Sequence, residues 1–115
     1  MGRMTAGVLA IAVSASTAAA GPMTNDMDLI YGRYQMAIRA AILCRSLQPN
    51  DQTWRQWSTY LDRKTNHELG AGERLSVLDG AKDDVMLMVR RKGCDSDQVK
   101  DLLSLYDAEL AGMAK

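Results

Sequence analysis

The sequence contains two cysteines, Cys44 and Cys94, and their oxidation state limits what the chain can fold into. If they are bonded, they tie together segments that lie far apart in the chain and so stabilise a small domain. If they are free, they are available for redox chemistry or as metal ligands. The choice depends on the compartment, which the N-terminal residues indicate.

Residues 1–20 have the three parts of a secretory signal peptide. Arg3 supplies a positive start, residues 7–13 are apolar, and small residues precede Gly21 as a signal peptidase requires. The uninterrupted apolar run is shorter than the about 20 residues that span a bilayer, which favours a cleaved signal over an uncleaved anchor. We therefore expect an exported protein, periplasmic or secreted, with no stable membrane span after cleavage.

Cleavage after Ala20 leaves residues 21–115, which suffice for one domain and are too few for two. Loss of Arg3 lowers the Lys and Arg count from 14 to 13 against 14 Asp and Glu, which gives a formal net charge of −1. Proteins that bind nucleic acid usually concentrate basic residues on one surface. The nearly neutral charge therefore argues against a nucleic-acid partner.

An even number of cysteines in an exported chain indicates a disulfide, and two cysteines allow only the intramolecular pairing Cys44–Cys94. Neither cysteine belongs to a CxxC pair or has a histidine close by in the sequence, which disfavours a metal site. Three basic residues at positions 90–92 would favour a thiolate at Cys94, so a reactive thiol is the open alternative. We predict a structural disulfide.

Apolar residues recur at steps of three and four through the mature chain, which predicts helices throughout. The expected helices span residues 26–47, 51–68 and 73–92, and a fourth begins after a cap at Asp95 or Ser96. The expected breaks are residues 49–51, with Asp51 as the next cap, then residues 70–72, and then Gly93. The predicted fold is all-α: a small four-helix bundle-like domain with one disulfide, at residues 21–115, preceded by the signal peptide.

The third and fourth expected helices each carry an apolar stripe that should face the core. On the third helix the stripe is Leu75, Leu78, Ala81, Val85, Met88 and Val89, widened by Met86 and Leu87. On the fourth it is Val99, Leu102, Leu103, Tyr106 and Leu110.

The motifs of common enzyme and metal sites are incomplete in this sequence. His67-Glu68 begins like the zinc motif HExxH, but Ala71 stands where the second histidine is needed. The glycines at positions 70 and 72 lack the third glycine of a dinucleotide-binding loop. The acidic residues at positions 73, 79, 83 and 84 lack the ExxH pairs of di-iron bundles, so we expect a solvated face. We expect no enzymatic activity, no metal and no cofactor.

Trp54 and Trp57, one helical turn apart, are the candidate residues for binding a partner. Tryptophan often anchors protein interfaces. A chain without phenylalanine also needs large apolar side chains for its core, so the sequence leaves core and surface open for both residues.

The order of signal peptide, helical body, long disulfide loop and a helix after the second cysteine resembles that of small periplasmic acid-stress chaperones. The resemblance implies a protein that binds other proteins and has no active site. We therefore expect a small exported, non-enzymatic interaction protein, chaperone-like or inhibitory, whose partner is another protein. The alternative is a helical bundle that binds a small ligand or cofactor between its helices.

Overall fold

The computed structural model describes residues 26–114, and the predicted signal peptide lies outside them. Within these residues the chain forms four α-helices, one short 3₁₀ helix and no strand. The elements are α2 (Asp26–Arg45), α3 (Asp51–Lys64), α4 (Ala71–Lys92), α5 (Asp97–Glu109) and η3 (Ala111–Met113). The predicted all-α fold is confirmed.

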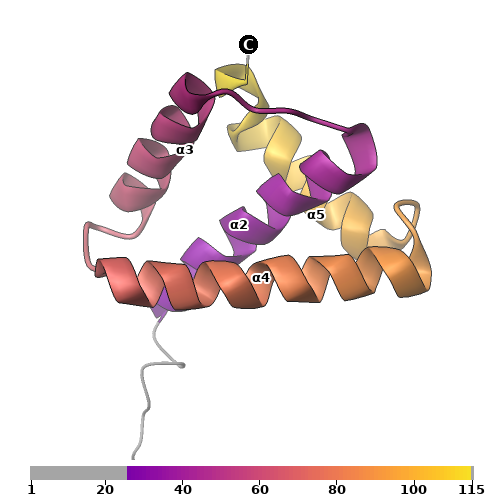
Figure 1. Cartoon of the computed structure of the whole chain (residues 1–115), viewed down its shortest axis with the longest axis horizontal. Helices are drawn as coiled ribbons and strands as arrows, with labels where there is room; N and C mark the ends of the chain where they lie inside the picture. The colour runs from indigo at the N-terminus through magenta and orange to yellow at the C-terminus, as the bar shows by residue number, and fades with distance from the viewer. Residues whose placement is uncertain (1–25, 115) are drawn as a thin grey trace, which may run out of the picture.

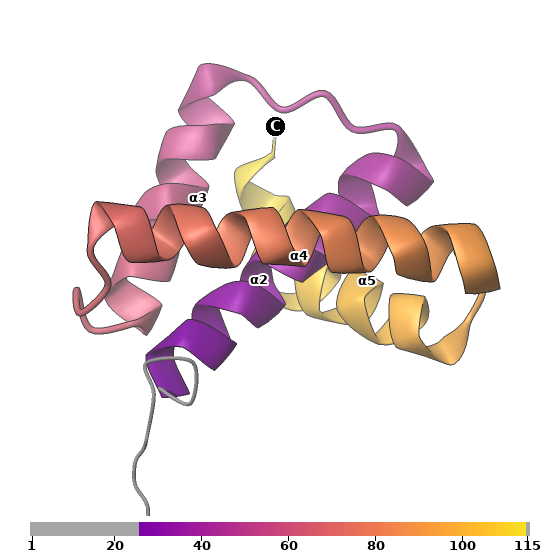
Figure 2. The same ribbon diagram turned by 60° about the horizontal axis from the view of Figure 1, so that its bottom comes forward.

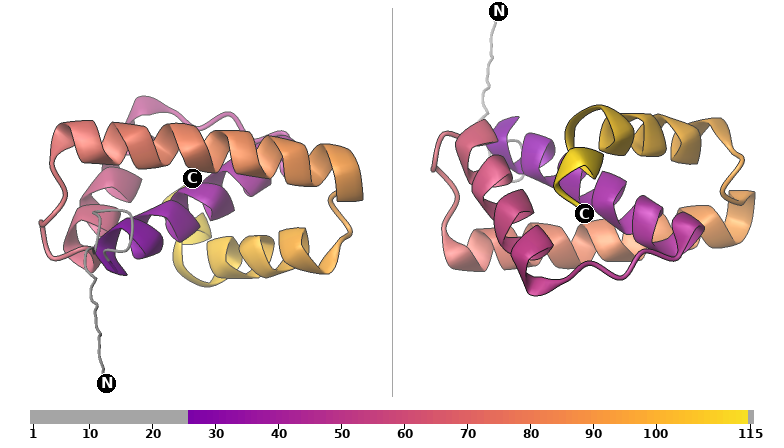
Figure 3. Two further views of the ribbon diagram at one scale, coloured as in Figure 1. Left: turned by 90° about the horizontal axis from the view of Figure 1, so that it is seen from below. Right: turned by 90° about the horizontal axis from the view of Figure 1, so that it is seen from above.

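The central helix of the bundle is α2, which passes diagonally behind α4 in Figure 1. Its most extensive packing is against α4 and then against α5, and these two helices flank it when the molecule is seen from below (Figure 3). Three alanines of α2, at positions 37, 40 and 41, are fully buried. Their small side chains allow the neighbouring helices to pack closely around α2.

The connection between α2 and α3 differs from the prediction by one or two residues. α2 ends at Arg45, two residues early, and Ser46 follows with a φ of 54° in the left-handed region. The N-cap of α3 is Asn50 rather than Asp51. The Asn50 side chain accepts a hydrogen bond from the Thr53 backbone N–H at 2.8 Å, which satisfies one of the free donors of the first turn.

The break between α3 and α4 lies earlier in the chain than residues 70–72, where we predicted it from the glycines. α3 ends at Lys64, and the chain reverses at Asn66 and His67, whose φ angles of 57° and 59° are left-handed. Asparagine and histidine tolerate this conformation better than most residues do. Gly70 is therefore the N-cap of α4, and the helix begins two residues before its expected start.

The corner between α4 and α5 follows the prediction and is visible as a tight turn in Figure 2. Gly93 has a φ of 82°, and its N–H donates to the Val89 carbonyl at 2.8 Å. The Ser96 hydroxyl then caps α5 by accepting from the Val99 N–H at 3.3 Å. A left-handed stop followed at once by a cap lets the chain fold back within a few residues.

The apolar stripe predicted for α4 is wrong at its N-terminal end. Ala81 and Val85 are buried as expected, whereas Leu75 is 61% exposed. Val77, which the prediction left out, packs against the core in its place. Two further residues of the predicted stripe are also exposed, Met86 and Leu87. In the described part of the chain, no helix is both long enough and apolar enough to cross a membrane.

Candidate functional site

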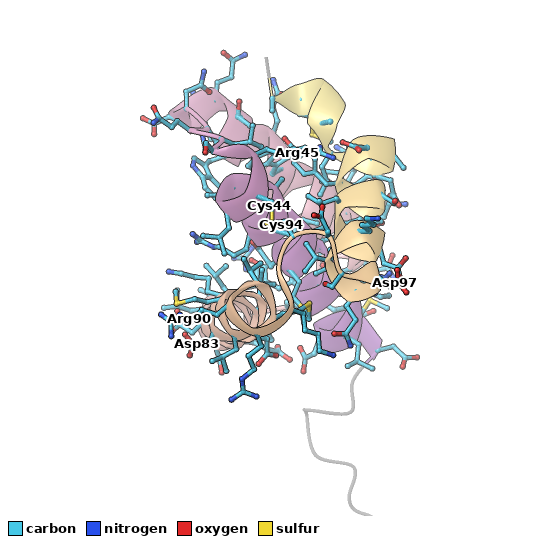
Figure 4. The ribbon with its side chains drawn as sticks, turned by 90° about the vertical axis from the view of Figure 1, so that its right-hand side faces the viewer. Cys44, Arg45, Asp83, Arg90, Cys94 and Asp97 are labelled. Atoms are coloured by element: carbon cyan, nitrogen blue, oxygen red, sulfur yellow. A yellow bond between two sulfur atoms is a disulfide. The ribbon has the colours of Figure 1, made fainter. Side chains whose placement is uncertain are left out.

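The disulfide joins the last turn of α2 to the corner before α5 (Figure 4). Cys44 and Cys94 are bonded, with their Cα atoms 5.8 Å apart, so the predicted pairing is confirmed. The neighbouring Arg45 forms an ion pair with Asp107 of α5 through both guanidinium nitrogens. A covalent bond and an ion pair therefore fasten α2 to the α5 side of the bundle.

The two tryptophans lie on α3 with their rings edge to face, and the ring centroids are 5.1 Å apart. Trp57 is 1% exposed, and its indole N–H donates to the Leu110 carbonyl at 3.0 Å. Trp54 is half-buried at the edge of the core. Partner binding by the pair stays a prediction, and only Trp54 has accessible surface for it.

A polar cluster that sequence reasoning missed joins three helices at Glu109. The Tyr34 hydroxyl of α2 donates to Oε1 of Glu109 at 2.6 Å, and the Tyr60 hydroxyl of α3 donates to the same oxygen. These two hydrogen bonds hold the pKa of Glu109 below its ordinary value. Burial and the contact with Glu109 raise the pKa of both tyrosines. Both tyrosines are hydrogen-bonded to Glu109, so the cluster links α2, α3 and α5.

A groove of about 490 Å³ runs between α2 and the N-terminal half of α4. Its volume lies within the range of about 300–1,000 Å³ that is usual for ligand sites. The lining is mainly apolar or small, with two carboxylates and one guanidinium. The residues are Asp28, Leu29, Gly32, Arg33 and Met36 of α2, and Ser76, Val77, Gly80, Ala81 and Asp84 of α4. We call this feature the α2–α4 groove.

Two glycines shape the α2–α4 groove in different ways. A Cβ at Gly32 would lie 3.2 Å from Val77 Cγ1, so a larger residue there would require the Val77 side chain to shift by a few tenths of an ångström. A Cβ at Gly80 would meet nothing within 4 Å, so packing within the described chain gives no reason for this glycine. A glycine inside a helix costs about 0.5–1 kcal/mol relative to alanine. Gly80 therefore leaves open space in the groove at the expense of helix stability.

Asp28 lies in the first turn of α2 and is 5% exposed. Its Oδ1 is buried and has no hydrogen-bond partner. The carboxyl of Glu73 on α4 approaches it, and this hydrogen-bonding contact with Asp28 is the largest of the causes that raise the pKa of Glu73. Two acidic groups therefore meet beside the groove, and no basic side chain among residues 26–114 forms an ion pair with either of them.

The remaining acidic residues of α4 follow the predicted solvated face. Asp79 and Asp83 are exposed, and Asp83 points away from the other helices in Figure 4. His67 is exposed and pairs with Asp62. Among residues 26–114, no three His, Cys, Asp or Glu side chains are arranged to hold a metal ion.

One exposed leucine, Leu29, lines the α2–α4 groove and is 62% exposed. Leu75 is also exposed, but it shares a face of α4 with Asp79, one turn further on, and that face is directed away from the groove. Sequence reasoning placed Leu75 in the core and did not identify Asp28, Gly32 or Gly80. The signal in the sequence was a glycine inside each of two expected helices, where glycine costs about 1 kcal/mol relative to alanine.

Comparison of the chain with protein-family models, with curated proteins and with solved structures found no match.

Proposed function

We propose that the chain is a small exported protein, periplasmic or secreted, that binds another protein through the α2–α4 groove and the exposed Leu29 in its lining. It acts by binding and has no catalytic step. The binding serves a chaperone-like or inhibitory role.

The unfilled, mainly apolar α2–α4 groove with the exposed Leu29 in its lining is the observation that carries this proposal. Leu29 keeps 62% of its surface in water next to a groove of about 490 Å³ that nothing in the described chain fills. Concave, mainly apolar surfaces of this size are usual binding sites. Gly80 adds to the argument, because a glycine without an internal packing role lets another backbone or side chain come close.

Two features support export. Disulfides persist mainly in oxidising compartments, and the Cys44–Cys94 bond closes a long loop in a small domain. The N-terminal sequence has the layout of a signal peptide. The periplasm of a bacterium and the extracellular space both satisfy these requirements.

Site-specific photo-crosslinking tests the proposal. A photoreactive residue is placed at Leu29, at Ser76 of the lining and, as a control, at the exposed Ser104 of α5, and the exported protein is irradiated in living cells. We expect the same discrete adduct from the two groove positions and none from Ser104. An adduct at Ser104 alone, or equal adducts at all three positions, would place the binding surface elsewhere.

The second candidate function is the binding of a small ligand between the helices, and the volume of the α2–α4 groove favours it. Native mass spectrometry of the purified protein distinguishes the two candidates. A small molecule that copurifies with the chain and is lost in a Gly80→Leu variant would establish the ligand-binding function. A bare polypeptide mass would leave the ligand-binding function without support.

A further inference from the structure

Helix α3 is tied to the other helices differently from the way they are tied to one another. The disulfide joins the end of α2 to the corner between α4 and α5, and the ion pair of Arg45 with Asp107 joins α2 to α5. Neither link includes a residue of α3. Among the described elements, those whose backbone comes close to α3 are α2 and η3, and α3 stands to one side of the other helices in Figure 1.

The side chains of α3 are held largely by one short stretch, residues 109–113, which we call the C-terminal segment. The Trp57 indole N–H donates to the Leu110 carbonyl at 3.0 Å. One turn earlier in α3, the Thr53 hydroxyl donates to the Met113 carbonyl at 3.4 Å. Both contacts reach backbone carbonyls at the end of the chain, so they depend on how that end is placed.

The last turns of α3 contact the same segment through the carboxylate of Glu109. The Tyr60 hydroxyl donates to Oε1 of Glu109, and the Lys64 ammonium nitrogen lies 3.5 Å from this oxygen. An ion pair of Asp62 with Arg74 at 4.0 Å links α3 to α4, next to the connection between these helices. The contacts distant from the connections therefore all end on the C-terminal segment.

Both connections of α3 contain left-handed residues other than glycine. Ser46 precedes α3 with a φ of 54°, and Asn66 and His67 follow it with φ angles of 57° and 59°. Such conformations are uncommon for these residue types and recur in segments that switch between two arrangements. Leu69 is 6% exposed and holds the second connection to the core just before α4. A rotation at residues 66–67 would therefore move α3 and leave α4 in place.

We infer that α3 is a lid that opens as one unit about residues 46 and 66–67 when it leaves the C-terminal segment, while the disulfide keeps α2, α4 and α5 together. Opening exposes Trp57 and Leu61, which are each 1% exposed in the closed form. Residues at the ends of elements commonly absorb the backbone change in motions of this kind.

This inference goes beyond the proposed function, because the α2–α4 groove has no residue of α3 in its lining. Groove binding is read from crosslinks at Leu29 and Ser76, whereas lid opening is read from α3 in the purified protein. Either one can fail while the other holds.

Hydrogen exchange of the intact, disulfide-bonded protein, followed by NMR, tests the inference. The Trp57 indole N–H is a direct probe, because it is bonded to Leu110 in the closed form and is released when α3 opens. We expect this proton and the backbone amides of α3 to share one opening and to exchange at least about tenfold faster than the slowest amides of α4. Equal protection of α3 and α4 would show that α3 opens only when the whole domain unfolds. Protection that falls steadily toward one end of α3 would indicate fraying. Either result would overturn the inference.

Two tyrosine variants form a matched pair, because both hydroxyls bond to Glu109 and only Tyr60 lies on α3. Tyr60→Phe removes a bond that lid opening breaks, so exchange of the Trp57 indole N–H should become about tenfold faster. Tyr34→Phe removes a bond that the open form keeps, so the same exchange should stay within about twofold. Without a lid, both bonds break only on complete unfolding, and both variants would speed the exchange equally. Equal acceleration, or none in either variant, therefore contradicts the inference.

Discussion

Gly32 of α2 lies so close to Val77 of α4 that an added Cβ would be 3.2 Å from Val77 Cγ1. This contact sets how near the two helices come and therefore how the groove between them is shaped. It also explains why Val77, and not Leu75, is the apolar residue that α4 turns inward at this end.

Alanine at the two groove glycines should have different effects. Both substitutions remove a glycine from a helix interior, which favours folding by about 0.5–1 kcal/mol. The added methyl of Gly80→Ala meets no atom within 4 Å, so this variant should show the gain in stability. The added methyl of Gly32→Ala crowds Val77, so the free energy of unfolding of this variant should be about 1–3 kcal/mol lower than that of Gly80→Ala. Urea unfolding measures both. Equal gains at the two positions would show that the helices are not closely packed at Gly32.

Loss of the disulfide should destabilise the domain strongly. Cys44 and Cys94 are 50 residues apart, and in the loop-entropy account closing such a loop contributes about 4 kcal/mol. The Cys44→Ser/Cys94→Ser variant should therefore unfold at a much lower urea concentration than the oxidised protein. A loss below about 1 kcal/mol would mean that the reduced chain keeps the same ends together in its unfolded state.

The Glu109 cluster should make the free energy of unfolding depend on pH. The pKa of Glu109 is lowered by the tyrosine hydroxyls, so its contribution is present above the ordinary carboxyl pKa and is lost as the pH falls through the lower, folded value. Glu109→Gln should unfold more easily than the wild type at pH 7, by about 1 kcal/mol.

The same difference should shrink in acid, because the wild-type carboxylate becomes protonated as well. Urea midpoints at pH 7 and at about pH 3 test this sign. The exposed Asp83→Asn is the control and should show no difference at either pH. If the difference in urea midpoint between the wild type and Glu109→Gln stays constant or widens in acid, the ionised Glu109 is not the source of this stability.

Two aspartate substitutions test the orientation of the helices. Leu102 is 3% exposed, so Leu102→Asp would bury an unpaired charge and should unfold the domain. Leu75→Asp places its charge in water and should leave the helical circular dichroism signal and the melting temperature nearly unchanged. Unfolding by Leu75→Asp would show that the sequence pattern was right and that α4 turns this leucine inward.

Local patterns in the sequence were enough to predict the helices and the disulfide. Gly93 and Ser96 act through their own backbone and neighbours, so the α4–α5 corner could be predicted from the residues themselves. The predicted helix ends were less accurate where two neighbouring residues could both act as the cap. Asn50 and Asp51 are both good caps, and only the folded chain shows that Asn50 is used.

The groove and the Glu109 cluster could not be predicted, because both depend on helices that meet from far apart in the chain. Tyr34 and Glu109 are 75 residues apart, and no sequence pattern connects them. The face that α4 buries includes Val77, which lies against Gly32 of α2, and the apolar residues of α4 fit more than one helical stripe. The sequence did not distinguish Asp28 from an ordinary exposed residue, since acidic residues are common in the first turns of helices.

The proposed function treats the α2–α4 groove, which Asp28 lines, as a binding surface rather than as a part of the fold that adds stability. The α2 dipole favours a first-turn carboxylate by about 0.3–1 kcal/mol at the surface and by up to about 2 kcal/mol when it is partly buried, whereas a buried acceptor left unsatisfied costs about 1–3 kcal/mol and more when charged. The most direct test is the free energy of unfolding of Asp28→Asn at pH 7, with the exposed Asp79→Asn as control. We predict that Asp28→Asn is more stable than the wild type by about 1 kcal/mol and that Asp79→Asn differs by less than about 0.5 kcal/mol. A loss of about 1 kcal/mol or more in Asp28→Asn would show that the carboxylate serves the fold, and it would contradict the account.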